Sequence, residues 1–237
     1  MPGMQPPGSV VVTTAAGRVL VRAAADVPAV SVRSVRAKLS TDARAVSAAA
    51  AVSVEQAEGR VSIAVPEVRG RGRTPQVVVE VDVPAGTSVQ ADVGEAELVC
   101  SGPIGSLAAR STSGSVHAEQ VSGDLDVASG RGPVTVHQVT GSATVAVSDA
   151  VVIVRVAEGP LTVRGRSGDV HVWRLDAPAQ VTTSTGNIRL GWAQGRPVRL
   201  DVQTSTGAVN LDVPHDQAAP DAVSVRTISG DVRITAA

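Results

Sequence analysis

The chain has 237 residues, and its 21 Lys and Arg residues nearly balance its 22 Asp and Glu residues, which leaves a net charge of −1. A chain with this balance lacks the excess of basic residues that binds nucleic acid or an anionic membrane, so neither is expected as a partner. Hydrophobic residues make up 43% of the sequence but aromatic residues only 1%, with two Trp and neither Phe nor Tyr. The core must therefore consist of Val, Ala, Leu and Ile, and the abundance of β-branched Val favours strands.

The single cysteine excludes a disulfide within the chain. The first residues lack the basic and apolar regions of a secretory signal. The longest apolar stretches are a few residues long and could not cross a bilayer as a helix. We therefore expect a cytoplasmic protein without membrane insertion.

The N-terminal part of the chain divides into two segments. Residues 1–8 contain mainly Pro, Gly and Met and are predicted to be disordered. Residues 9–14 and 18–23 have the character of strands, and Ala15-Ala16-Gly17 between them predicts a hairpin. Residues 9–90 are interpreted as a β-rich section, formed either by irregular early coils or by a small cap. Its further strands are expected at 29–37, 44–55, 60–65 and 76–83.

A nine-residue repeat follows. From Ala96 to Gly186, every ninth residue is Gly or Ala, and the residues two and four places after each of them are apolar without exception, as at Val134 and Val136. Two inward side chains separated by one outward side chain make a short strand, because side chains alternate between faces. Gly between the strands permits a tight corner.

The full repeating unit has 18 residues. A third apolar residue, seven places after the Gly or Ala, occurs only at alternate positions, as at Val121, Val139 and Leu175. Two strands and two unequal corners thus make one coil, and such coils stack by pairing with their neighbours. The sequence therefore predicts an all-β fold, with a single-chain β-solenoid (β-helix) over residues 91–237. Its coils become broader after Gly195, and residues 214–222 are expected to form a surface loop.

The corners also carry a resemblance. Segments with Ser or Thr before Gly and an apolar residue after it recur through the chain, at 111–116, 167–170, 184–188, 205–209 and 229–232. On these corners the chain resembles the bacterial β-strand-repeat domains known as putative adhesins, a family of unknown function. The resemblance extends over roughly residues 10–235. It implies a β-helical fold with no known catalytic residues.

The outward strand positions do not favour an enzyme. A polysaccharide-cleaving solenoid needs clustered carboxylates, and the predicted outward positions stack no two carboxylates on neighbouring coils. Asp follows the corner Gly only at Asp124, Asp169 and Asp231, too few for a calcium-binding array, so these residues are expected to hydrogen-bond the turns. No metal and no other cofactor is expected.

One outward face differs from the other in carrying three His residues and a Trp near an Arg, a combination typical of contact sites. We predict that this face, centred on Trp173, contacts a protein partner. Its candidate residues are His117, His137, Ile153, Arg155, His171 and Trp173. Trp192 is instead expected in the core at a corner, and Cys100 is expected to be buried and unreactive.

The last predicted strand suggests a second contact. We expect it to leave unpaired backbone groups, which makes Val232 and Ile234 the candidate edge for self-association. The predicted function is a non-enzymatic structural or interaction module that presents a stacked-strand surface to a protein partner or self-assembles. The alternative is a carbohydrate-binding or carbohydrate-processing β-helix. A glycan is the less favoured partner, because it needs an aromatic- or carboxylate-lined groove.

Overall fold

The structure is a computed structural model that describes residues 8–38, 43–57, 59–66, 76–193 and 195–237. Most of the segment predicted to be disordered, residues 1–7, therefore lies outside the described residues. The chain divides into two compact units, Met1–Ser122 and Gly123–Ala237, which are treated in turn. In the parts of the chain that the structure describes, no helix is long and apolar enough to cross a membrane.

The first unit contains two sets of paired strands. One set runs in the spatial order β9 (Leu107–Ser111), β7 (Ser88–Asp92), β1 (Ser9–Thr13), β5 (Arg60–Ala64) and β4 (Ser53–Ala57). The other runs in the order β10 (Val116–Val121), β8 (Glu97–Ile104), β2 (Gly17–Ala24), β6 (Val77–Pro84) and β3 (Ser31–Ala37). The pairs are parallel except at the far end, where β4 pairs with β5 and β3 pairs with β6 in antiparallel fashion.

The predicted hairpin at residues 15–17 is wrong. β1 pairs with β5 and β7, whereas β2 pairs with β6 and β8, so the two strands belong to different sheets. Both strands bury alternate valines, such as Val10 and Val19. Because each strand turns its apolar side toward the same interior, the segment between them forms a corner of a coil.

The strand predicted at 44–55 is wrong over most of its length. Residues Ala43–Ala50 form the helix α1, and a strand begins only at Ser53. This segment contains five alanines in eight residues, and Ala has the highest helix propensity. Ala45 and Ala48, three residues apart on one helix face, are buried where α1 packs against β3 and β6.

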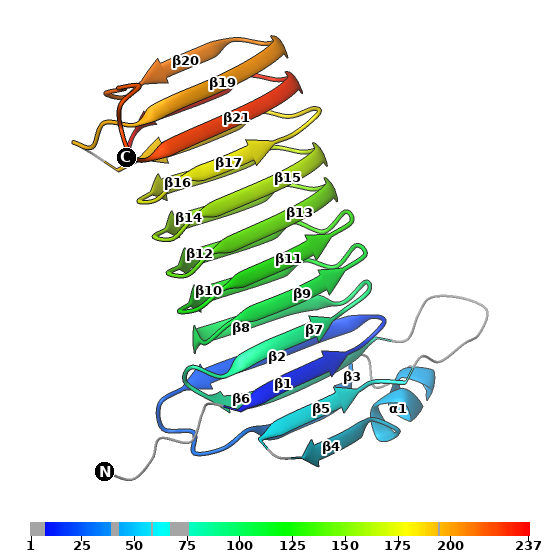
Figure 1. Cartoon of the computed structure of the whole chain (residues 1–237). Coiled ribbons are helices and arrows are strands. Elements are labelled where there is room, and N and C mark those ends of the chain that lie inside the picture. The colour runs from blue at the N-terminus through cyan, green and yellow to red at the C-terminus, as the bar shows by residue number, and fades with distance from the viewer. Residues whose placement is uncertain (1–7, 39–42, 58, 67–75, 194) are drawn as a thin grey trace, which may run out of the picture. The chain divides into compact units, whose positions relative to one another are not determined.

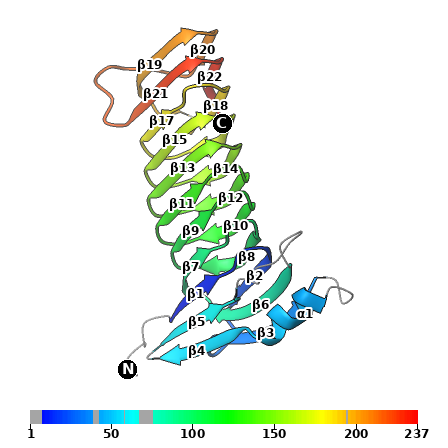
Figure 2. The ribbon, with the colours of Figure 1, turned by 90° about the vertical axis from the view of Figure 1, so that its right-hand side faces the viewer.

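The second unit again has two sets of strands, which Figure 1 shows stacked one beside the next. The first set runs in the order β11 (Leu125–Ser129), β13 (Ala143–Asp149), β15 (Leu161–Ser167), β17 (Ala179–Thr182), β21 (Ala222–Ser229) and β19 (Arg199–Thr206). The second runs in the order β12 (Val134–Val139), β14 (Val152–Ala157), β16 (Val170–Leu175), β18 (Ile188–Trp192), β22 (Val232–Ala236) and β20 (Val209–Asp212). The strand pairs within these two sets are parallel, and the two sets face one another in the view of Figure 2.

The 18-residue coil is confirmed by the register of the strands. Val134 pairs with Val152, and Val152 pairs with Val170, each 18 residues further along. In the first unit, Leu98 pairs with Val116 at the same separation. Like residues therefore stack from coil to coil, as in a β-solenoid.

The interior is aliphatic, as predicted. Every inward residue of the nine-residue repeat between Leu98 and Leu190 is at most 4% exposed. Trp192 is 1% exposed, and its indole Nε1 donates a hydrogen bond to the Arg196 carbonyl, which confirms its place in the core. Burying these side chains is the main favourable term that holds the coils together.

The order of coils along each stack departs from the order in the chain. In the second unit, β21 and β22 come last in sequence but lie between β17–β18 and β19–β20. In the first unit, β1 and β2 come first in sequence but lie between β5–β6 and β7–β8. Each unit thus places its terminal coil between two other coils.

Candidate functional site

A corner motif sets up the outward face of the second unit. The pattern Gly-Asp/Asn-apolar-basic-apolar occurs at 168–172, 186–190 and 230–234. The Asx side chains link the coils: Asp169 Oδ1 accepts a hydrogen bond from the Asn187 backbone N–H at 2.7 Å, and Asn187 Oδ1 accepts one from the Asp231 N–H at 3.1 Å. These bonds fix the register of the strands that follow each corner.

Asp124 performs the same task at another corner. Its Oδ1 accepts hydrogen bonds from the Ser142 hydroxyl at 2.7 Å and from the Ser142 backbone N–H at 3.0 Å. These two bonds hold the pKa of Asp124 below its usual value, because they stabilise the carboxylate form. The prediction that the corner Asp residues hydrogen-bond the turns is therefore confirmed, and their partners lie on the neighbouring coil.

As a result of this register, basic side chains stack at one outward position. Ile153 pairs with His171, His171 pairs with Arg189, and Arg189 pairs with Arg233. These residues come from β14, β16, β18 and β22. A guanidinium Nη1 of Arg189 lies 3.0 Å from His171 Nε2. Because a guanidinium can only donate, His171 Nε2 is the acceptor in this contact.

Trp173 stands two residues further along β16 and is 63% exposed. The guanidinium carbon of Arg155 lies 5.9 Å from the centroid of its ring. A cation at this distance over an indole face is attracted by the ring electrons. The indole is therefore held by a neighbour on one side and open to solvent elsewhere.

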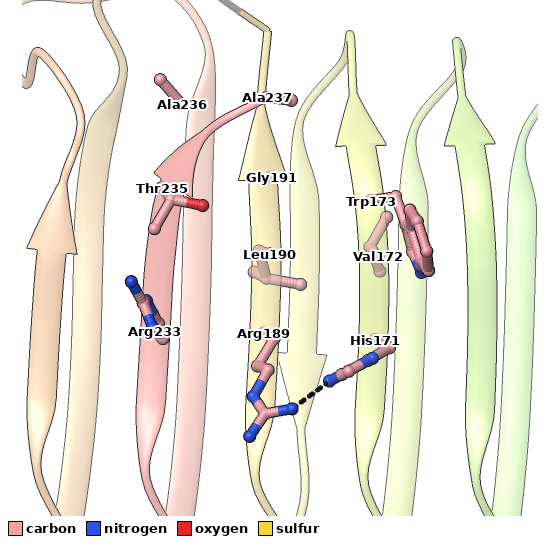
Figure 3. Close-up of a pocket in the computed structure, with 10 residues that line it drawn as sticks. All are labelled: His171, Val172, Trp173, Arg189, Leu190, Gly191, Arg233, Thr235, Ala236 and Ala237. Atoms are coloured by element: carbon pink, nitrogen blue, oxygen red, sulfur yellow. Dashed lines mark hydrogen bonds between the residues drawn. The ribbon is translucent and has the colours of Figure 1, made fainter.

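An open hollow of about 600 Å³ lies next to Trp173 (Figure 3). Gly191 forms part of its lining, and a Cβ atom there would come within 1.9 Å of the Trp173 carbonyl oxygen. The close approach of the two backbones thus requires glycine at this position. The hollow is lined by His171, Val172, Trp173, Arg189, Leu190, Gly191, Arg233, Thr235, Ala236 and Ala237.

The structure brings together part of the predicted partner face. Ile153, Arg155, His171 and Trp173 lie on the adjacent strands β14 and β16 of the second unit. His137 is half-buried on β12, the strand paired with β14. His117 is half-buried on β10 of the first unit, where it pairs with Val99.

Two residues of this surface were missing from the predicted face. Arg189 and Arg233 extend the row that begins at Ile153, and both are exposed. Arg233 was missed because β22 joins the stack 44 residues after β18, which breaks the 18-residue spacing. The shared corner motif at 186–190 and 230–234 is the signal that could have found it.

The predicted edge at Val232 and Ile234 is wrong. These residues are 1% and 0% exposed, and β22 is paired on both sides, with β18 and with β20. Among the described strands of the second unit, the outer position beyond β22 belongs to β20, whose Val209 and Leu211 are 44% and 40% exposed. The free edge of this set of strands therefore belongs to β20, in the coil that comes just before the last coil in the sequence.

Many carboxylates near the outward faces have structural partners. Arg–carboxylate pairs join Arg18 to Glu97, Arg36 to Glu80, Arg174 to Asp176, Arg196 to Asp221 and Arg226 to Asp201. Cys100 is buried, and desolvation raises the pKa of its thiol to about 12, so it is not an activated nucleophile. Among the described residues, no three His, Cys, Asp or Glu side chains gather as metal ligands.

The chain has the fold class of a parallel β-solenoid, or toastrack. The chain matches the Toastrack DUF4097 family over residues 34–236 and therefore belongs to that family. This confirms the resemblance at the level of the family.

The chain also has a match among solved structures. Among solved structures, the chain is similar to the crystal structure of a putative cell adhesion protein from Clostridium sporogenes, at 10% identity and a TM-score of 0.26. That similarity covers 99% of this chain and 96% of the other. No curated protein matches the sequence.

Proposed function

We propose that this toastrack domain is a non-enzymatic interaction module that binds a protein partner through the Trp173 face. This face comprises Ile153, Arg155, His171, Trp173, Arg189 and Arg233. The exposed indole of Trp173, held by Arg155, is the observation that carries the proposal. Trp and Arg are the residues that most often dominate the binding energy of protein interfaces.

The polar groups at the corners join neighbouring coils, which supports a structural role for the rest of the fold. The corner residues Asp124, Asp169 and Asp231 each use one carboxylate oxygen, Oδ1, to accept hydrogen bonds from a neighbouring coil. The interior is closely filled with aliphatic side chains. Such a fold gives a rigid outward surface on which side chains occupy fixed positions.

The test is affinity purification from the cells that produce the protein, with tagged wild type, Trp173→Ala and Thr144→Ala. Thr144 is an exposed residue of β13 in the opposite sheet and serves as the matched control. We expect Trp173→Ala to lose at least one specific partner that wild type and Thr144→Ala retain. Retention of every partner by Trp173→Ala would refute the proposal.

A second candidate function is self-association through the β19–β20 coil. Among the described strands, β20 is paired only with β22, and β19 only with β21. Unpaired strand edges are templates for pairing with a second chain, and here Val209 and Leu211 add exposed apolar surface. Two copies meeting edge to edge would form a closed dimer.

Light scattering over a range of protein concentrations tests this second candidate. We expect the wild type to associate and Leu211→Lys to shift the equilibrium toward the monomer, since a charge on the edge opposes pairing. Ile228→Lys is the control, because Ile228 is 61% exposed on β21, which is paired on both sides. A wild type that stays monomeric at high concentration, or equal effects of both variants, would refute self-association through this edge.

A further inference from the structure

The three basic residues of the Trp173 face lie in one row. His171, Arg189 and Arg233 occupy the same outward position on the consecutive strands β16, β18 and β22. Neighbouring strands are about 4.8 Å apart, so their Cα atoms span roughly 10 Å. Within the described residues, neither Arg189 nor Arg233 forms an ion pair with a carboxylate, in contrast to Arg174 and Arg196.

The acidic residues at the preceding corners are occupied elsewhere. Asp169 Oδ1 accepts hydrogen bonds from the backbone and side chain of Asn187, and Asp231 Oδ1 accepts one from the Ala208 backbone N–H at 2.8 Å. Each corner Asp lies two residues before the basic residue of its own strand, whereas Trp173 lies two residues after His171. Arg189 and Arg233 line the hollow (Figure 3), and the donors of Arg233 and those of Arg189 that do not contact His171 are available to an external acceptor.

The hollow adds an apolar element to this row. Trp173 borders it together with the small residues Gly191, Ala236 and Ala237. A site with two guanidinium groups and an adjoining indole fits a ligand that carries both carboxylates and an apolar group. Charge-assisted bonds from Arg to a carboxylate are about twice as strong as neutral hydrogen bonds.

We propose that the Trp173 face binds an acidic polypeptide segment, whose carboxylates pair with Arg189 and Arg233 while an apolar side chain enters the hollow beside Trp173. This rests on the proposed function and specifies the chemistry of its partner. Side chains on one side of an extended peptide are about 6.8 Å apart, a spacing that the long arginine side chains can accommodate. A polypeptide is favoured over a glycan because Arg155 already occupies one side of the Trp173 indole.

Fluorescence anisotropy with a fluorescein-labelled peptide of alternating Glu and Leu tests the proposal on the full chain. We expect this peptide to bind wild type, and a Lys-Leu peptide of the same length not to bind. The double variant Arg189→Gln/Arg233→Gln should weaken binding by about tenfold, because two exposed ion pairs are lost. Arg164→Gln/Arg199→Gln, which removes two exposed arginines from the other sheet, is the matched control and should bind within about twofold of wild type.

Three outcomes would contradict the proposal, each in a different way. Equal losses in both double variants would show attraction by net charge alone and overturn the proposal, as would failure of the Glu-Leu peptide to bind wild type. A polygalacturonate oligosaccharide that binds more tightly than the peptide, and depends on the same arginines, would assign the face to an acidic glycan instead. Circular dichroism confirms that each variant is folded.

The same variants separate this inference from the proposed function. Affinity purification with Arg189→Gln/Arg233→Gln is compared with the Trp173→Ala result. If Trp173→Ala loses the partner but the arginine variant retains it, the face binds a protein whose recognition is not acidic. If both variants retain every partner, the proposed function itself is wrong.

Discussion

Gly165 and Gly168 lie three residues apart, yet substitution by alanine should have opposite effects. At Gly165 on β15, a Cβ atom would lie 3.4 Å from methyl groups of Val147 and Thr183, close to ordinary contact. At Gly168, φ is +126° and a Cβ atom would lie 2.0 Å from the Ala150 carbonyl oxygen. We expect Gly165→Ala to raise the free energy of unfolding by about 0.5 kcal/mol and Gly168→Ala to lower it by about 2 kcal/mol. Urea unfolding measures both, and a similar change in the two variants would contradict this reading of the corner.

Cys100 offers a test of the dry interior. Its thiol has a pKa raised to about 12 by desolvation, against an ordinary value of 9.0. Between these values the unfolded thiol loses its proton while the native thiol keeps it. The free energy of unfolding should therefore be unaffected below about pH 9 and fall as the pH rises above it.

The measurement for Cys100 is urea unfolding of wild type and Cys100→Ala from about pH 8 to about pH 10.5. Wild type should lose stability relative to Cys100→Ala as the pH rises, because only wild type has the thiol. Iodoacetamide should in addition modify Cys100 only after unfolding. Identical pH dependence of the two proteins, or rapid alkylation of native protein, would show that the thiol is accessible to solvent.

At the scale of a strand, substitutions at the inward and outward positions of β15 should differ sharply in their effect on stability. Leu161 is 1% exposed and stacks on Ala143 and Ala179, whereas its neighbour Thr162 points outward. Leu161→Ala should lower the free energy of unfolding by about 3 kcal/mol, because it leaves a cavity between two small residues. Thr162→Ala should change it by no more than about 0.5 kcal/mol. Equal effects in thermal unfolding would mean that this strand does not separate an interior from a surface.

The inward and outward positions of the strands are the feature of the fold that the sequence predicted best. The residues two and four places after each repeated Gly or Ala, such as Val134 and Val136, could be assigned to the interior because one period governs both the strand and the coil. Outward neighbours such as Ile153 and His171 follow from the same alternation. That periodicity alone predicts Arg155 on the coil next to Trp173.

The nine-residue period could not predict the segments that do not follow it, or the order in which the coils stack. The alanines of residues 43–50 suit a helix as well as an apolar strand, and packing against β3 and β6 decides between them. The order of the coils depends on which loop is long enough to pass over a neighbour, which no local pattern encodes. For this reason Val232 and Ile234 were placed at an edge, and Arg233 was not recognised beside Arg189.

At the scale of the whole molecule, the order of the coils predicts an unusual pattern of protection in the second unit. β19 and β20 precede β21 and β22 in the chain, but only the latter pair has neighbours on both sides among the described strands. Backbone amides of β21 and β22 should therefore exchange with deuterium at least about tenfold more slowly than those of β19 and β20. Hydrogen exchange followed by mass spectrometry resolves the two segments. Faster exchange in β22 than in β20 would contradict the observed order.

The placement of β1 and β22 has a mechanical consequence. A strand at the free end of a stack can be peeled away by tension, which breaks its hydrogen bonds one after another. β1 is flanked by β5 and β7, and β22 by β18 and β20, so a pull along either strand loads two ladders at the same time. These bonds must shear together before the strand can leave. Tension applied along β1 or β22 would therefore meet strong resistance at these strands.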